Sequence, residues 1–408
     1  MFAKMFLALI FSFSASLLQA ATEVATPVIV HTTLGPAPEI RPESKPLAKW
    51  YEKINLRGYT QVRFNRLGNP DSGVVSPQGD KGVGGNNSFF IRRARLIFFG
   101  DVADNVSIYI QPDLASTPEG ATSNNFAQLR DLYADIYLDQ EREFRFRLGQ
   151  SKVPYGFENM QSSQNRLALD RNDALNSAVK DERELGLFFY WAPFEGRKRF
   201  KHLVDSGLKG SGDYGVFGVG AYNGQNPNKP EQNRDLHTVV RLTYPWELPN
   251  GQIIETGVQG YMGRYGITSE PAITRDADYL DQRVAASLIY YPQPLGFQAE
   301  YNVGVGPQLN GAQTAVEQGD LEGGYAQLMY KYKNFVPFAR AQYYKGGRKH
   351  DLNAPYQDIR ETEVGLEYEV NKAIELTGMY TWTDRNTATK PYPVRSTNLI
   401  RIQAQINY

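Results

Sequence analysis

The strongest constraint on the fold is an alternation of apolar and charged residues, which is clearest in the segment EFRFRLGQ at residues 143–150. Successive side chains of a β-strand point to opposite faces, so Phe144 and Phe146 would share one face and Arg145 and Arg147 the other. One surface of this strand is then apolar and the other is cationic. Such a strand needs an apolar environment on one side and a polar one on the other.

The same period of two recurs along the chain after residue 53. In the segments 54–65, 92–99, 131–138 and 361–370, apolar side chains alternate with polar or charged ones. Counting such segments predicts about 16 strands, an even number that lets an antiparallel sheet close without leaving an edge. We therefore expect an all-β protein, an antiparallel transmembrane β-barrel.

The breaks between these segments alternate in length, as is typical of outer-membrane barrels. Short breaks rich in Gly, Pro, Asn and Asp have the composition of tight turns, and the long breaks are polar. The short breaks include 101–105, 248–251, 291–296 and 370–374, and the long ones are 66–88, 115–125, 157–184, 224–235, 268–281, 308–320, 350–358 and 386–397.

Composition excludes several classes of protein. The 408 residues include 44 Lys plus Arg and 44 Asp plus Glu, so no general basic surface for nucleic acid is indicated. Cysteine is absent, which excludes disulfides and thiolate metal sites. The mean hydropathy of −0.48 is low, as it also is in transmembrane barrels, where only half of each strand meets lipid. The 26 Tyr and 21 Phe residues favour strands.

The first 53 residues do not share the alternating pattern. Lys4 precedes an apolar run that ends at small residues near Ala20, which predicts a signal peptide over residues 1–20. Residues 21–53 contain prolines at 27, 36, 38, 42 and 46 and are expected to be an extended periplasmic segment. The barrel is then expected over residues 54–408.

Four stretches, 49–67, 89–115, 128–138 and 146–164, together resemble the phosphate-selective porin O/P family. The resemblance extends over essentially the whole chain after the predicted signal peptide and is densest before residue 200. It implies a 16-stranded homotrimeric barrel in the outer membrane of a Gram-negative bacterium, in contact with membrane lipid. It also implies that the third long loop, residues 157–184, folds into the lumen and narrows it.

The resemblance also implies a cationic pore wall that conducts small anions, inorganic phosphate or polyphosphate among them. A cationic lining lowers the barrier for anions, and guanidinium groups match the geometry of phosphate. Alternatively, the same arginines pair with acidic residues, namely Asp131, Asp135, Asp170, Asp173, Glu182 or Glu184, and brace the wall. The candidate residues are Arg57, Arg63, Arg93, Arg95, Arg145 and Arg147 on the wall, with Arg166, Arg171, Lys180 and Arg183 on or beside the loop.

Two other functions remain open on the sequence alone. The later strands carry acidic residues on the expected lumen face, so the basic wall could face an acidic one, as in a general diffusion porin. A barrel with long loops could also act mainly as a surface adhesin or scaffold. The acidic residues are Glu300, Glu361, Glu363, Glu367, Glu369 and Glu375.

No motif indicates an enzyme, a cofactor or a metal site. The segment GSGDYG at 210–215 has the spacing of a dinucleotide motif, but the residues after it alternate like a strand. The four histidines, His31, His202, His237 and His350, are scattered and lack the spacing of metal ligands. We therefore expect a channel with neither catalytic residues nor a cofactor.

Overall fold

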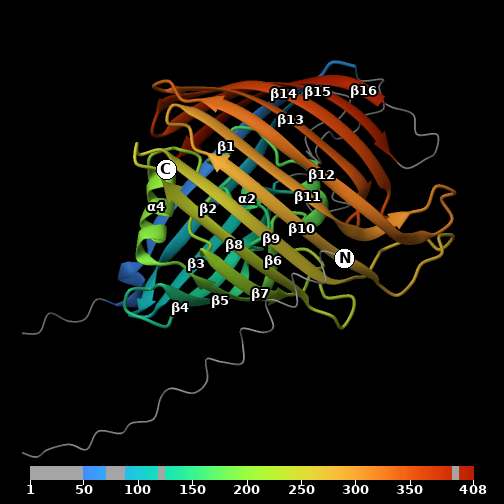
Figure 1. The fold of residues 1–408 in the computed structure, drawn as a ribbon, viewed down its shortest axis with the longest axis horizontal. Helices are drawn as coiled ribbons and strands as arrows, with labels where there is room; N and C mark the ends of the chain where they lie inside the picture. The colour runs from blue at the N-terminus through green and yellow to red at the C-terminus, as the bar shows by residue number, and fades with distance from the viewer. Residues whose placement is uncertain (1–48, 70–87, 118–124, 388–394) are drawn as a thin grey trace, which may run out of the picture. The chain divides into compact units, whose positions relative to one another are not determined.

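The computed structural model describes residues 49–69, 88–117, 125–387 and 395–408. Within these residues, sixteen strands form one antiparallel sheet (Figure 1). The first strand pairs with both the second and the last, so the sheet closes into a barrel. The predicted barrel and its strand number are confirmed. The signal peptide and most of the Pro-rich segment lie outside the described residues.

The elements follow one another in an almost unbroken series of strands. Among the described residues, no helix has the length and hydropathy needed to cross a membrane. The elements are η1 (Trp50–Lys53), β1 (Asn55–Leu67), β2 (Ser88–Ala103), β3 (Val106–Ser116), β4 (Phe126–Tyr137), β5 (Phe144–Lys152), α2 (Phe157–Met160), α3 (Asp173–Ala178), β6 (Arg183–Trp191), α4 (Phe194–Asp205), β7 (Phe217–Tyr222), β8 (His237–Glu247), β9 (Ile253–Tyr265), β10 (Tyr279–Tyr290), β11 (Leu295–Leu309), β12 (Val316–Tyr330), β13 (Phe335–Gly347), β14 (Tyr356–Asn371), β15 (Ile374–Thr387) and β16 (Arg395–Asn407).

The predicted alternation is present in the wall of the barrel. In β5, Phe144 and Phe146 are exposed on the outer face, whereas Arg145 and Arg147 are buried inside. An apolar outer face matches lipid, and a polar inner face matches a wet lumen. The segment at residues 143–150 therefore folds as its pattern predicts.

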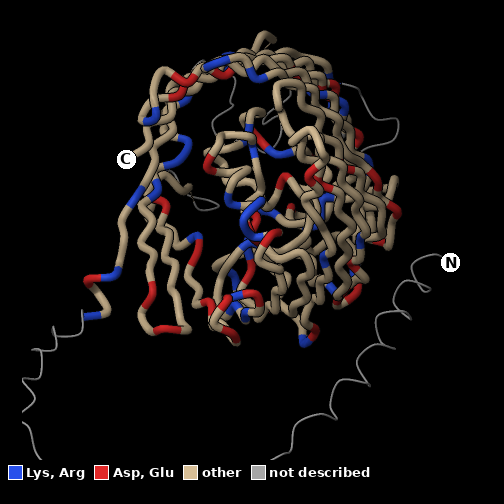
Figure 2. The backbone as a smooth tube through the Cα atoms, turned by 60° about the vertical axis from the view of Figure 1, so that its left-hand side comes forward, with Lys and Arg blue, Asp and Glu red and all other residues tan. Residues whose placement is uncertain are grey.

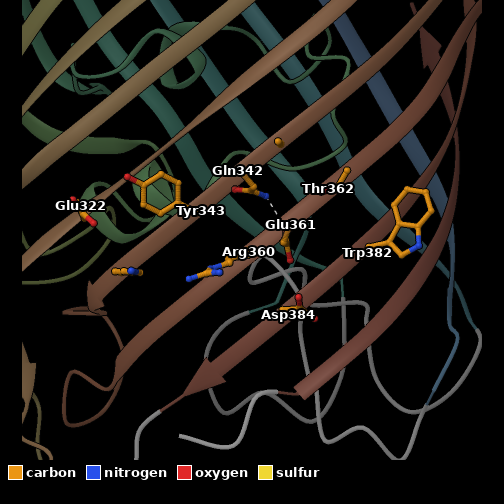
Figure 3. Close-up of a pocket in the computed structure, with 10 residues that line it drawn as sticks. Glu322, Gln342, Tyr343, Arg360, Glu361, Thr362, Trp382 and Asp384 are labelled. Atoms are coloured by element: carbon orange, nitrogen blue, oxygen red, sulfur yellow. Dashed lines mark hydrogen bonds between the residues drawn. The ribbon is translucent and has the colours of Figure 1, made fainter.

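The strands on another part of the wall show the same division (Figure 3). Trp382 of β15 is exposed on the outer face, as is Thr362 beside it in β14. On the inner face, the side-chain amide of Gln342 in β13 donates to Glu361 in β14 at 2.6 Å. Inner polar groups thus bond to one another across neighbouring strands.

Connections between strands differ in two places from those expected. β11 and β12 continue into the predicted loop 308–320 and pair as far as Leu309 and Val316. The sequence pattern did not predict these strand ends because they are polar and lack the alternating apolar residues that indicate a strand. The connection from β6 to β7, residues 192–216, is on the short-turn side of the barrel but is long and contains α4. The strand expected after 210–215 is present as β7.

Part of the lumen is occupied by chain. Figure 2 shows segments inside the ring of strands that carry both basic and acidic residues. The main one is the connection between β5 and β6, residues 153–182, which includes α2 and α3 and is buried along most of its length. We call it the inward loop. It contains most of the loop predicted at 157–184, of which residues 183 and 184 belong to β6.

The outer face can be tested with a charge. Val364 lies on the outer face near the middle of β14. We expect Val364→Arg to lower the free energy of unfolding by about 2–4 kcal/mol, the cost of an arginine near the bilayer midplane. Urea titration of the barrel refolded in lipid vesicles measures this. The matched control is Leu352→Arg in the exposed loop between β13 and β14, which should change stability little. An equal decrease in the free energy of unfolding for the two variants would contradict the assignment of Val364 to the outer face.

Candidate functional site

The inward loop is an ordered segment with its own hydrogen bonds. The side chain of Asn172 accepts a hydrogen bond from the backbone N–H of Leu175 at 3.1 Å and so caps α3. Asn172 in turn donates from its backbone and side chain to Glu158, at 2.8 and 2.7 Å. These contacts link the two short helices of the loop and fix the shape of the segment inside the barrel.

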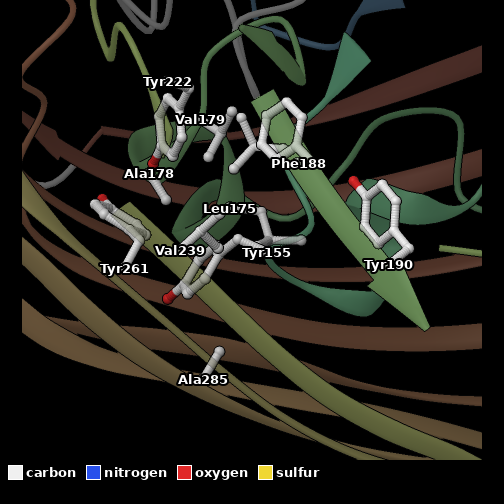
Figure 4. Close-up of a cluster of buried hydrophobic side chains, with 11 residues drawn as sticks. Tyr155, Leu175, Ala178, Val179, Phe188, Tyr190, Tyr222, Val239, Tyr261 and Ala285 are labelled. Atoms are coloured by element: carbon white, nitrogen blue, oxygen red, sulfur yellow. The ribbon is translucent and has the colours of Figure 1, made fainter. Parts of the chain in front are cut away.

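Apolar packing holds one side of the loop against the barrel wall (Figure 4). Tyr155 and three residues of the region around α3 pack on side chains that point inward from five successive strands, β6 to β10. Burial of this apolar surface favours the position of the loop. The cluster consists of Val153, Tyr155, Leu175, Ala178 and Val179 from the loop, and Phe188, Tyr190, Tyr222, Val239, Tyr261 and Ala285 from the wall.

Ion pairs hold the loop to other strands. Asp170 of the loop accepts hydrogen bonds from Arg63 of β1 at 3.0 Å and from Arg401 of β16 at 2.5 Å. Arg92 of β2 lies 3.4 Å from the same carboxylate. Burial raises the pKa of Asp170, but Arg63, Arg92 and Arg401 hold that pKa well below its ordinary value. The carboxylate is therefore charged and bound by several cations.

Four of the six acidic residues predicted on the later strands contact cations or the loop. Glu363 pairs with Arg340 and, at 3.1 Å, with Arg401. Arg340 also binds Glu158 of the loop at 2.7 Å. Glu361 likewise pairs with Arg385, and Glu367 pairs with Lys209. Glu300 accepts a hydrogen bond from the backbone N–H of Phe157 in the loop. Glu300, Glu361, Glu363 and Glu367 are thus buried in these contacts, whereas Glu369 is exposed and Glu375 is half-buried.

Two cavities lie inside the barrel near the first five strands. The first, of about 110 Å³, is nearer the long loops, because Thr117 at the end of β3 and Lys180 line it. We call it the loop-side cavity. Among its described lining residues are eight cationic and four acidic side chains, namely Arg92, Arg93, Arg95, Arg130, Arg166, Arg171, Lys180 and Arg348 against Asp113, Asp170, Asp181 and Glu182.

The second cavity, of about 220 Å³, is nearer the short turns, and we call it the turn-side cavity. Val204 of α4 and residues 211–214 of the β6–β7 connection form part of its lining. Arg95 lines both cavities, so the two are neighbours. Among the described lining residues of the turn-side cavity, the cations Arg57, Arg95, Arg147, Lys152 and Arg183 outnumber the carboxylates Asp131 and Asp213.

The structure brings most of the predicted residues to these cavities. Arg93, Arg95, Arg166, Arg171 and Lys180 line the loop-side cavity. Arg57, Arg147 and Arg183 line the turn-side cavity together with Arg95. Neither cavity includes Arg63, which binds Asp170, or Arg145, which binds Asp213 at 3.0 Å.

Several of these arginines also have the carboxylate partners considered from the sequence. Arg147 makes two hydrogen bonds to Asp135, at 2.7 and 2.8 Å, and Arg183 makes one to Asp131 at 2.9 Å. Arg166 lies 3.0 Å from Glu182, which Arg183 and Lys152 also approach. Burial raises the pKa of Glu182, but Arg166, Arg183 and Lys152 hold that pKa well below its ordinary value.

Strict alternation missed two further arginines of the loop-side cavity. At Arg92 in β2 and at Arg130 in β4, the register shifts by one residue, so each is the extra residue of a β-bulge. Simple alternation assigns Arg92 and Arg130 to the outer face, but each bulge places its arginine in the lining of the loop-side cavity. Pro112, which has no N–H to donate to the sheet, lies at the second register shift. It is the one residue whose type could have indicated a bulge from the sequence.

A closed sixteen-stranded barrel with a polar interior narrowed by an inward loop defines an outer-membrane channel. The family model of the phosphate-selective porins O and P matches residues 64–408. The chain belongs to this family. No curated protein matches the sequence.

Solved structures of outer-membrane channels share the fold. The channel DcaP of Acinetobacter baumannii is 16% identical, with a TM-score of 0.54 over 87% of this chain and 97% of that one. OmpF of Salmonella typhi, solved with daunomycin, is 14% identical, with a TM-score of 0.55 over 89% and 99%. An anion-selective porin from Comamonas acidovorans is 10% identical, with a TM-score of 0.51 over 87% and 99%.

The ion pairs of the loop predict the effect of removing its central carboxylate. In Asp170→Asn, Arg63 and Arg401 lose a buried counter-charge, which costs about 3–5 kcal/mol. Because strand pairing is untouched, we expect a folded barrel with a looser loop, seen as higher conductance and more current noise in planar bilayers. The control Asp276→Asn changes a carboxylate in the exposed loop between β9 and β10. If the currents of Asp170→Asn matched those of the control, the loop would not depend on Asp170.

Proposed function

We propose that the protein is a passive channel for small anions, and that anions pass through the loop-side and turn-side cavities past Arg95. The observation that carries this proposal is the excess of cationic over acidic side chains in both cavities. In a narrow lumen, an excess of fixed positive charge lowers the barrier for anions and raises it for cations. Inorganic phosphate fits this chemistry because guanidinium groups bind its oxygens in pairs.

Arg93 is the residue that we expect to matter most. Its Nη1 donates to Gln61 at 2.8 Å, and no carboxylate among the described residues lies within ion-pair distance of it. Arg93 is buried, with Arg92, Arg95 and Arg166 as neighbouring cations. A buried charge without a counter-charge is costly. An anion entering the loop-side cavity would supply that counter-charge.

The arrangement of the acidic residues supports an anion path over a transverse field. A general diffusion porin would need the acidic strands to face the passage. Here Glu361 and Glu363 are buried against Arg385, Arg340 and Arg401. Their charge is matched locally, whereas the loop-side cavity keeps an excess of cations. The basic wall therefore contributes more to the electrostatic potential in the loop-side cavity than Glu361 and Glu363 do.

Other parts of the proposal follow from the family. We propose a trimer in the outer membrane of a Gram-negative bacterium, with the long loops on the cell surface. Residues 1–20 would be a cleaved signal peptide and residues 21–53 a periplasmic segment. A barrel that serves only as an adhesin or scaffold would give no steady ohmic current in planar bilayers.

A reversal potential across a KCl gradient tests the anion path. We expect Arg93→Gln to lower the ratio of chloride to potassium permeability by about twofold or more, because one unmatched charge is lost from a confined site. The matched control is the double variant Arg241→Gln with Glu255→Gln. It removes a buried pair of opposite charges that lines neither cavity and should shift the ratio little. A wild-type channel without anion preference, or equal shifts in both variants, would contradict the proposal.

A further inference from the structure

The two cavities differ in chemistry as well as in size. The loop-side cavity, of about 110 Å³, has no aromatic side chain among its described lining residues. The turn-side cavity is about twice as large, at 220 Å³, and is lined by Tyr109, Tyr133 and Tyr214. All three tyrosines are half-buried, so part of each remains accessible. Cations and rings together favour a different solute from cations alone.

The rings of the turn-side cavity form an ordered stack. The guanidinium of Arg147 lies 3.8 Å from the ring centre of Tyr133. Tyr133 stacks on Tyr109 of the neighbouring strand, with ring centres 5.2 Å apart and planes 9° apart. Among the described residues, Tyr109 makes no other ring or cation contact. The stack therefore ends at Tyr109, which has a second face to offer to a flat molecule.

A cation lies beside the end of this stack. Arg57 of β1 lies over the ring of Phe99, at 5.6 Å, and Phe99 is the cross-strand partner of Tyr109. Arg57 is exposed, and its one side-chain hydrogen bond among the described residues goes to Gln164 at 3.4 Å. The other arginines of this cavity have carboxylate partners. Arg57 is the guanidinium best placed to receive a solute anion.

We propose that the turn-side cavity binds small organic anions that carry a flat ring. The anionic group would bind Arg57, and the ring would lie against Tyr109. The inference rests on the proposed anion path and adds the class of solute that it prefers. The loop-side cavity would act on the charge of a solute and the turn-side cavity on its shape.

A pair of phosphate esters with the same charge tests the preference directly. Phenyl phosphate and methyl phosphate are added in turn to channels carrying chloride current in a planar bilayer, and the half-blocking concentration of each is measured. We expect phenyl phosphate to block at about fivefold lower concentration, a gain typical of ring stacking. This comparison uses the unmodified protein and so does not depend on the folding of a variant.

Two variants then locate the preference. Tyr109→Leu should bring the ratio of the two half-blocking concentrations close to one. Arg57→Gln should raise both concentrations and leave their ratio near its starting value. The control Tyr343→Leu lies on the outer wall and should keep the ratio of the unmodified channel.

The outcomes separate this inference from the proposed function. If the channel prefers anions but the two esters block at the same concentration, the ring site is wrong and the anion path stands. If the ratio survives in Tyr109→Leu, the ring binds elsewhere and the assignment is overturned. If the channel shows neither anion preference nor block by either ester, the proposed function itself fails.

Discussion

The ion pairs between Asp170 and the arginines of the barrel wall are the interaction on which the interior depends. Asp170 lies on the inward loop, yet its partners Arg63 and Arg401 belong to the first and last strands. The same residue therefore ties the loop to the seam where the barrel closes. Because burial makes an unpaired carboxylate costly, the loop is stable where these cations surround it. Its position then decides which wall of the lumen stays open.

Once the loop is in place, the two sides of the lumen have different linings. Tyr155, Leu175 and Val179 pack beside β6 to β10, and Glu361 and Glu363 of β14 pair with Arg385 and Arg340. The loop-side and turn-side cavities lie along the first five strands, and cationic side chains outnumber carboxylates among their described lining residues. A chain with no excess of either charge overall can thus present a cationic passage.

The sequence carried enough information for the barrel but not for its interior. Period-two alternation identified the strands, and it assigned Phe144 and Arg145 to the correct faces, because each residue's environment is set by its own strand. It failed at Arg92 and Arg130, where a bulge reverses the face. It also missed α4, although the spacing of Phe200, Leu203 and Val204 is helical. Which arginine pairs with which carboxylate depends on contacts between residues far apart in sequence, and no local pattern encodes these.

The central claim is that anions lie against the basic wall of the first strands. Anomalous scattering from crystals of the protein soaked in bromide tests it most directly, because it locates the ion without altering a residue. We expect bromide in the loop-side cavity beside Arg93 and Arg166, and none beside Glu361 or Glu363. Bromide absent from the loop-side cavity, or rubidium bound there in a parallel soak, would contradict the account.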